Sequence, residues 1–117
     1  MAEYHYDLDT RKQRAKLHGL KKELLESFGD FNNKVFAEGA LSVKTKELIA
    51  LAISVAIRCD GCIAFHSQAA VKHGATRDEI MEVMGMALYM GAGPSLMYAA
   101  QAVEAFDQFA AQANAPD

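Results

Sequence analysis

Apolar residues recur at spacings of three and four along most of this chain, which is the pattern of helices with one buried face. Within residues 11–28 the apolar positions are Leu17, Leu20, Leu24 and Phe28. We expect an amphipathic helix there that ends at Gly29, because glycine commonly follows a helix C-terminus. A shorter group of apolar residues between 31 and 36 predicts a second helix that ends before Gly39.

The segment from residue 43 to 58 changes from charged to almost entirely apolar, which predicts a helix at the centre of the core. Ser42 can cap its N-terminus. A buried strand over residues 48–57 is the competing interpretation. Three alanines in that segment favour a helix, however, and no neighbouring segment resembles a partner strand. The apolar stretch is also well short of the ~20 residues that cross a bilayer.

Turn-forming residues then interrupt the helical pattern. Asp60 and Gly61 favour a turn across residues 59–62. After that turn we expect a helix over residues 63–73, which stops at Gly74.

The last third of the chain carries a helix-start signal and a helix break. Thr76 and Glu79 have the capping-box spacing, in which both side chains satisfy backbone N–H groups at the start of a helix. The expected buried face of that helix consists of Ile80, Val83, Met84, Ala87 and Leu88. A break at residues 91–94 precedes a final helix through Phe109.

These elements predict an all-α fold, a compact bundle of about six helices with short connections. The 117 residues suit a single domain. Apolar residues make up 51% of the chain, enough for a packed core. A nearly all-apolar central helix and many Met and Ala residues also favour a homo-oligomer, because so much apolar surface is unusual on a monomer.

Composition and charge disfavour several classes of partner and of cellular location. The net charge is -3, so nucleic acid and anionic membranes are poor partners. The charged N-terminal residues do not form a secretory signal, and two cysteines are too few for a secreted disulfide scaffold. We therefore expect a cytoplasmic protein with no membrane segment.

The chemistry is concentrated in Cys59-x-x-Cys62-x-x-x-His66. Two cysteines separated by two residues can cycle between dithiol and disulfide. Cys62 is expected at the start of the following helix, where the helix dipole favours a thiolate. His66 lies one turn further along the same face, so a proton transfer from Cys62 to His66 is geometrically reasonable. A thioredoxin site is disfavoured, since the preceding segment is helical rather than a strand.

The stretch from Leu41 to about Tyr98, half the chain, resembles the alkylhydroperoxidase D-like branch of the carboxymuconolactone decarboxylase superfamily. The residues that carry the resemblance are Leu41-Ser42, Lys46-Glu47-Leu48, Ser54-Val55, the Cys59/Cys62/His66 motif, Ala69-Ala70, Gly74-Ala75-Thr76, Glu79-Ile80 and Glu82-Val83. The resemblance implies a single domain of this family, with its core over 41–98 and an N-terminal helical extension over 1–40. It implies an all-helical trimer or hexamer. It also implies reduction of organic hydroperoxides, or electron transfer to a peroxiredoxin, with a thiol or dithiol donor and no cofactor.

The resemblance also assigns roles at matching positions. Cys62 would attack the peroxide oxygen and become a sulfenic acid, which Cys59 would resolve as a disulfide. His66 would relay the proton, and Glu47 would orient His66 or accept the proton from it. One departure is Gly61, because well-studied members carry a histidine immediately before the second cysteine.

Three alternatives remain open. The cysteines could be two buried apolar side chains in a non-catalytic helical oligomer that acts as a structural or partner-binding module. They could bind zinc with His66, and with His73 as a fourth ligand, although we expect no metal. The chain could instead act on a lactone or another small acid, although decarboxylase members of the superfamily generally lack the cysteine pair. Glu47 taken alone is simply a glutamate favoured in a first helical turn.

Overall fold

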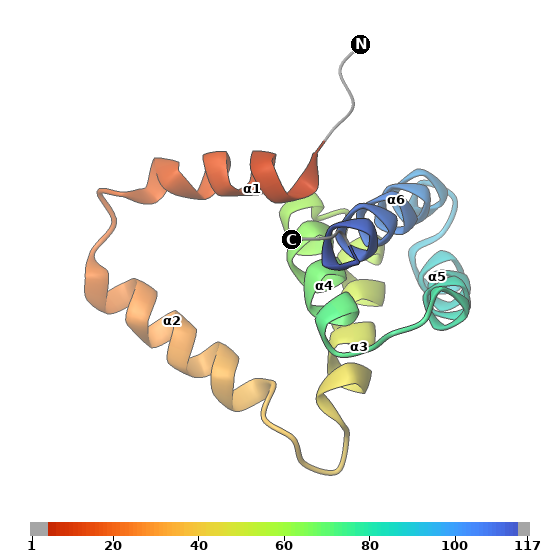
Figure 1. Cartoon of the computed structure of the whole chain (residues 1–117), viewed down its shortest axis with the longest axis horizontal. Helices are drawn as coiled ribbons and strands as arrows, with labels where there is room; N and C mark the ends of the chain where they lie inside the picture. Colours follow the sequence, from red (N-terminus) through yellow and green to blue (C-terminus); the bar gives the residue numbers. More distant parts are fainter. Residues whose placement is uncertain (1–4, 115–117) are drawn as a thin grey trace.

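The computed structural model describes residues 5–114, and all their regular structure is helical (Figure 1). The elements are α1 (Tyr6–Arg14), the 3-10 turn η1 (Ala15–Leu17), α2 (Lys22–Val35), α3 (Val43–Ala56), α4 (Asp60–Lys72), α5 (Arg77–Gly91) and α6 (Ser95–Ala113). The all-α prediction with about six helices is confirmed. None of the helices within these residues is both long and apolar enough to cross a bilayer.

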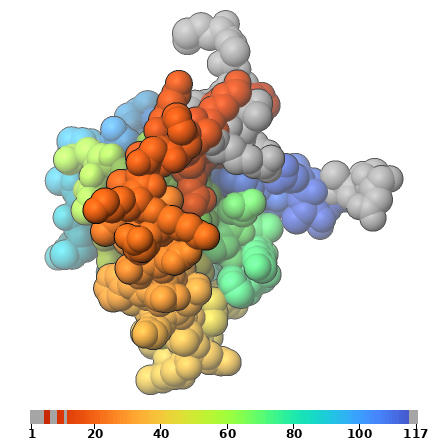
Figure 2. Space-filling view, turned by 90° about the vertical axis from the view of Figure 1, so that its left-hand side faces the viewer, coloured from red at the N-terminus to blue at the C-terminus, as the bar shows by residue number. Residues whose placement is uncertain are grey.

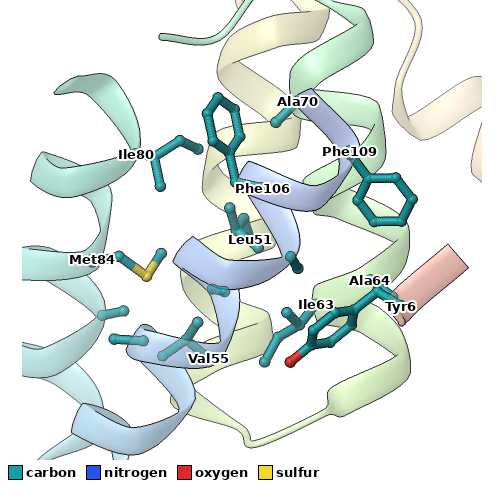
Figure 3. Packing of buried hydrophobic residues seen from close by; sticks show 14 residues of the cluster. Tyr6, Leu51, Val55, Ile63, Ala64, Ala70, Ile80, Met84, Phe106 and Phe109 are labelled. Carbon is teal, nitrogen blue, oxygen red and sulfur yellow. The ribbon is translucent and has the colours of Figure 1, made fainter. Parts of the chain in front are cut away.

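The core is formed by α3, α4, α5 and α6, with the most extensive packing between α4 and α6 (Figures 1 and 3). Leu51 of α3, Ile63 of α4 and Ile80 of α5 are fully buried, and α6 contributes Phe106 and three alanines. The alanines of α6 let its backbone approach the neighbouring helices closely. From outside the four helices, α1 adds Tyr6, whose ring lies beside α4 in Figure 3.

Local signals explain where the core helices start. Ser42 caps α3, as predicted, by accepting a hydrogen bond from the backbone N–H of Thr45 at 3.1 Å. The capping box of α5 is complete: Thr76 accepts from Glu79 N–H, and the Glu79 carboxylate accepts from Thr76 N–H. The predicted face of α5 is also correct, since its five apolar residues lie in the core or pack against it.

The N-terminal helix boundaries differ from the prediction. The expected helix over residues 11–28 is instead divided among α1, η1 and α2, and the chain leaves helical structure at residues 18–21, around Gly19. The expected stop at Gly29 is wrong, since α2 continues through this residue to Val35. A glycine inside a helix costs only about 1 kcal/mol relative to alanine, which the rest of α2 overcomes.

α2 is set apart from the other α-helices. Among the described residues, no Cα of α2 lies within 8 Å of a Cα in another α-helix, and no α2 residue is buried. Its apolar side chains are exposed, with Phe28 at 70% and Phe31 at 64% of their full accessible area. Figure 2 views the molecule from this side, with α1, η1 and α2 in front of the helical core.

The Glu79 carboxylate links the capping box to α3, and this predicts a pH effect on stability. The Thr76 N–H donates to it at 2.8 Å and the Lys44 ammonium lies at 3.0 Å, so the pKa of Glu79 is below its usual 4.5. A lowered folded-state pKa stabilises the protein above pH 4.5, and this contribution is lost as the pH falls through the folded value.

We therefore expect the free energy of unfolding to fall less steeply below pH 4.5 in Glu79→Gln than in the unsubstituted protein, measured by urea titration at several pH values. Glu82→Gln, an exposed position on the same helix, is the matched control. Equal slopes for Glu79→Gln and the unsubstituted protein would contradict the assignment.

Candidate functional site

The end of α3 determines where the cysteines lie. Arg58 adopts a left-handed conformation, with φ of 61°, after the last turn of α3. Its N–H donates to Val55 O at 3.1 Å, and the N–H of Cys59 donates to Ser54 O at 2.9 Å. This pair of bonds is the Schellman motif, which usually has glycine where Arg58 stands. The reversal of direction leads the chain from α3 directly into α4.

The predicted turn across residues 59–62 is wrong, because α4 begins at Asp60. Cys59 is the N-cap residue, and its sulfur accepts a hydrogen bond from the backbone N–H of Cys62 at 3.2 Å. A sulfur atom thus replaces the oxygen of a usual N-cap, a substitution that cap preferences do not anticipate. Cys62 consequently lies in the first turn of the helix rather than before it.

Cys59 and Cys62 form a disulfide, with their Cα atoms 5.2 Å apart. Both residues are partly buried rather than enclosed in the core. The sulfur atoms lie where the unpaired N–H groups and the dipole of α4 favour negative charge.

Helix packing brings the other two predicted residues together. His66 of α4 and Glu47 of α3 are joined by a hydrogen bond of 2.8 Å between His66 Nδ1 and Glu47 Oε1. The Glu47 side chain is only 6% exposed and that of His66 is 17% exposed. A carboxylate can only accept, so Nδ1–H donates to Glu47, and in the neutral ring Nε2 is left as the proton acceptor.

Two aromatic residues that the sequence did not single out enclose His66. The Phe36 ring is stacked on the imidazole, with centroids 5.5 Å apart and an angle of 26° between planes. Phe65 makes an edge contact at 5.3 Å and 82°. Phe65 could have been noticed as the direct neighbour of His66. Phe36 comes from the connection between α2 and α3, and no local pattern places it beside His66.

An open cavity of about 570 Å³ lies over the disulfide. Its walls come from α1, α2 and α4, and Cys59, Cys62 and His66 are part of its lining. Leu25, Phe28 and Phe65 make it largely apolar. Gly61 also lines this cavity, and nothing lies within 4 Å of the position that a Cβ would occupy there. The absence of a side chain at residue 61 is therefore not required by packing.

The geometry gives no support to the zinc alternative. Among the described residues, no three His, Cys, Asp or Glu side chains are grouped as a metal site requires. His73 is the C-cap of α4, seven residues after His66 and therefore about 10 Å further along the helix axis.

The sequence profile of the carboxymuconolactone decarboxylase family matches residues 22–105, most of the chain. The chain belongs to this family. Two uncharacterized proteins are similar over much of their length. A Cupriavidus necator protein is 36% identical over 106 residues, 86% of this chain and 94% of the relative. A Paracoccus denitrificans protein encoded in the cox locus is 37% identical over 83 residues, 71% of this chain and 75% of the relative.

Solved structures of other family members share the fold. A Legionella pneumophila member is 51% identical, with a TM-score of 0.82 over 90% of this chain and 94% of that one. A Thermotoga maritima member, described as a candidate participant in the antioxidative response, is 29% identical, with a TM-score of 0.76 over 92% of both chains. The resemblance found in the sequence is therefore confirmed at the level of the family.

Replacement of Glu47 tests how strongly this buried contact stabilises the family fold. We expect Glu47→Ala to lower the free energy of unfolding by about 1–3 kcal/mol, because the partly buried His66 Nδ1–H loses its acceptor. Glu47→Gln keeps a carbonyl oxygen on a side chain of the same length, so its free energy of unfolding should fall less. Urea denaturation measures both values, and equal losses in the two variants would show that the hydrogen bond contributes little.

Proposed function

We propose that this family member is a thiol-dependent peroxidase, which reduces hydroperoxides through a cycle between the Cys59–Cys62 dithiol and disulfide. The observation that carries the proposal is the pairing itself: a disulfide at the N-terminus of α4 that borders an open cavity. His66 lines the same cavity, and Glu47 is hydrogen-bonded to His66. The antioxidative role suggested for the Thermotoga maritima relative is in line with this activity.

In the proposed first step, the Cys62 thiolate attacks the terminal oxygen of the hydroperoxide and breaks the O–O bond. The sulfur is oxidised to a sulfenic acid, and the alkoxide that leaves takes up a proton and becomes an alcohol. His66 supplies that proton after it has accepted one from the Cys62 thiol through Nε2. Glu47 holds Nδ1 and balances the positive charge that the imidazole acquires.

In the second step, Cys59 attacks the sulfur of the sulfenic acid. The S–O bond breaks and a disulfide forms, and the departing hydroxide takes up the proton of the Cys59 thiol and leaves as water. A thiol or dithiol donor, or a peroxiredoxin that exchanges electrons with this protein, returns the pair to the reduced state with two electrons and two protons. The cytoplasm suits this cycle, because its reducing thiol pool can regenerate the dithiol.

The cysteine variants test the cycle. Cys62→Ser should abolish hydroperoxide consumption, whereas Cys59→Ser should stop after one equivalent and leave a sulfenic acid or an intermolecular disulfide. Intact mass and thiol counting after mild peroxide measure both outcomes, and the unsubstituted protein should lose two thiols in one reversible intramolecular bond.

Full activity in both variants would contradict the proposed cycle. Thiols that stay reduced under peroxide would instead favour the non-catalytic oligomer. An activity on a lactone that survives the double variant would favour the chemistry for which the family is named.

We also propose that the protein works as a homo-oligomer, a trimer or hexamer by its resemblance to known members. The exposed apolar side of α2 supports this, since an isolated helix of 14 residues is marginal in water without a partner. A second apolar surface lies between α3 and α5, where Ile53, Met86 and Met90 line an open groove of about 460 Å³.

A charge on the apolar side of α2 should weaken the assembly. We expect Phe31→Asp to shift the mass measured by light scattering after size exclusion towards that of one chain. Glu26→Lys, on the far side of the same helix, should leave it unchanged. A single-chain mass for the unsubstituted protein at micromolar concentration would contradict the proposal.

A further inference from the structure

The connection between α2 and α3 carries a side chain that reaches the redox site. Phe36 follows the last residue of α2 and caps that helix with its N–H, which donates to Asn32 O at 3.0 Å. Its ring is stacked on His66, which belongs to a different part of the chain. Since α2 does not pack against the core, that helix by itself cannot fix the position of Phe36.

Lys46 supplies the missing restraint. Its ammonium group donates to Val35 O at 2.9 Å and to Ala37 O at 2.6 Å, the two carbonyl groups on either side of Phe36. Val35 O belongs to the last turn of α2, where carbonyl groups lack helical partners and a cation is favoured. Lys46 is also the residue before Glu47 on α3, so one turn of α3 holds both Phe36 and His66.

These contacts restrain the imidazole from three directions. Glu47 binds Nδ1, Phe36 covers one face of the ring, and Phe65 contacts it edge-on. Glu47 alone would allow the ring to tilt about the Nδ1–Oε1 bond. The stacked Phe36 ring opposes that tilt and keeps water away from this face, so the direction of Nε2 is maintained.

We propose that Lys46 and Phe36 are positioning residues for His66: the Lys46 ammonium fixes the backbone on both sides of Phe36, whose ring holds the imidazole in the orientation needed at the cysteine pair. This role rests on the proposed thiol peroxidase cycle. Neither residue needs to touch the hydroperoxide, because each acts through the orientation of His66. A small displacement of a proton-transfer group can cost up to about 100-fold in rate.

Paired substitutions separate the restraint from general stability. Lys46→Met keeps the length of the side chain and removes the donors, whereas Lys46→Arg keeps donors and charge. Phe36→Leu keeps apolar volume without an aromatic ring, and Phe36→Tyr keeps the ring. Lys44→Met is the matched control, since Lys44 stands two residues before Lys46 on α3 and pairs with Glu79 instead.

The first measurement does not depend on activity. Nitrogen–proton correlation spectra of the reduced protein report the tautomer of His66 and the ring-current shifts of its carbon-bound protons, with His66→Gln used to assign the signals. We expect Lys46→Met and Phe36→Leu to lose the ring-current shift from Phe36 and to show mixed tautomers. Lys46→Arg, Phe36→Tyr and Lys44→Met should keep both features.

The second measurement is the oxidation of the two thiols by tert-butyl hydroperoxide. We expect the rate at saturating peroxide to fall about tenfold in Lys46→Met and Phe36→Leu with little change in KM, because the residues orient a proton-transfer group rather than bind substrate. Lys46→Arg and Phe36→Tyr should recover most of the rate, and Lys44→Met should match the unsubstituted protein.

An unchanged His66 tautomer and rate in Phe36→Leu, or unchanged ring-current shifts in Lys46→Met, would overturn the proposal. Equal loss in Lys44→Met would also overturn it, by showing that the effect is general destabilisation of α3. Should Lys46→Met fail to fold by circular dichroism, Phe36→Leu against Phe36→Tyr decides. If the unsubstituted protein does not react with the hydroperoxide, the peroxidase cycle is refuted, and so is the catalytic part of this role. The spectra would still show whether Lys46 and Phe36 fix the orientation of His66.

Discussion

The packing of α3 against α4 is the constraint on which the site depends. These helices are joined by a connection so short that the Schellman motif at Arg58 leads directly to the Cys59 cap of α4. The reversal turns α4 back along α3, which sets His66 opposite Glu47 with a hydrogen bond of 2.8 Å. The left-handed backbone at Arg58 costs about 1 kcal/mol for a residue other than glycine. The extensive packing of α4 on α6 and α3 offsets that cost and holds the reversal in place.

Local signals predicted most of the helical core from the sequence. The Ser42 cap and the Thr76 capping box are short-range features, and both are present. The N-terminal boundaries were wrong because apolar periodicity alone does not distinguish one helix from two that share the same spacing. Gly29 illustrates the limit: it marks a helix end only where the following residues cannot continue the helix, and α2 continues for six more residues.

The contacts of the candidate site also divide into those that the sequence could predict and those that it could not. The i, i+4 relation of Cys62 and His66 follows from the sequence once the segment is known to be helical. The contact between Glu47 and His66 joins two helices, so residue spacing could not supply it and only resemblance to a family suggested it. Neither residue spacing nor the family resemblance indicated Phe36. Its position on His66 depends on two hydrogen bonds from Lys46 to main-chain carbonyl groups. Backbone acceptors are present at every residue and therefore leave no pattern in the sequence.

Gly61 makes the orientation of His66 more important in this chain. Well-studied relatives carry a histidine at the matching position, and the space around Gly61 would accommodate a side chain. Without that second imidazole, the proposed cycle has His66 as the histidine of the motif that exchanges protons with the cysteine pair. A relay with one acceptor depends on a single ring direction, and here that direction is determined by a buried carboxylate and two aromatic contacts. In the proposed cycle, the contacts that orient His66 therefore carry the proton transfer that a second histidine at residue 61 would otherwise share.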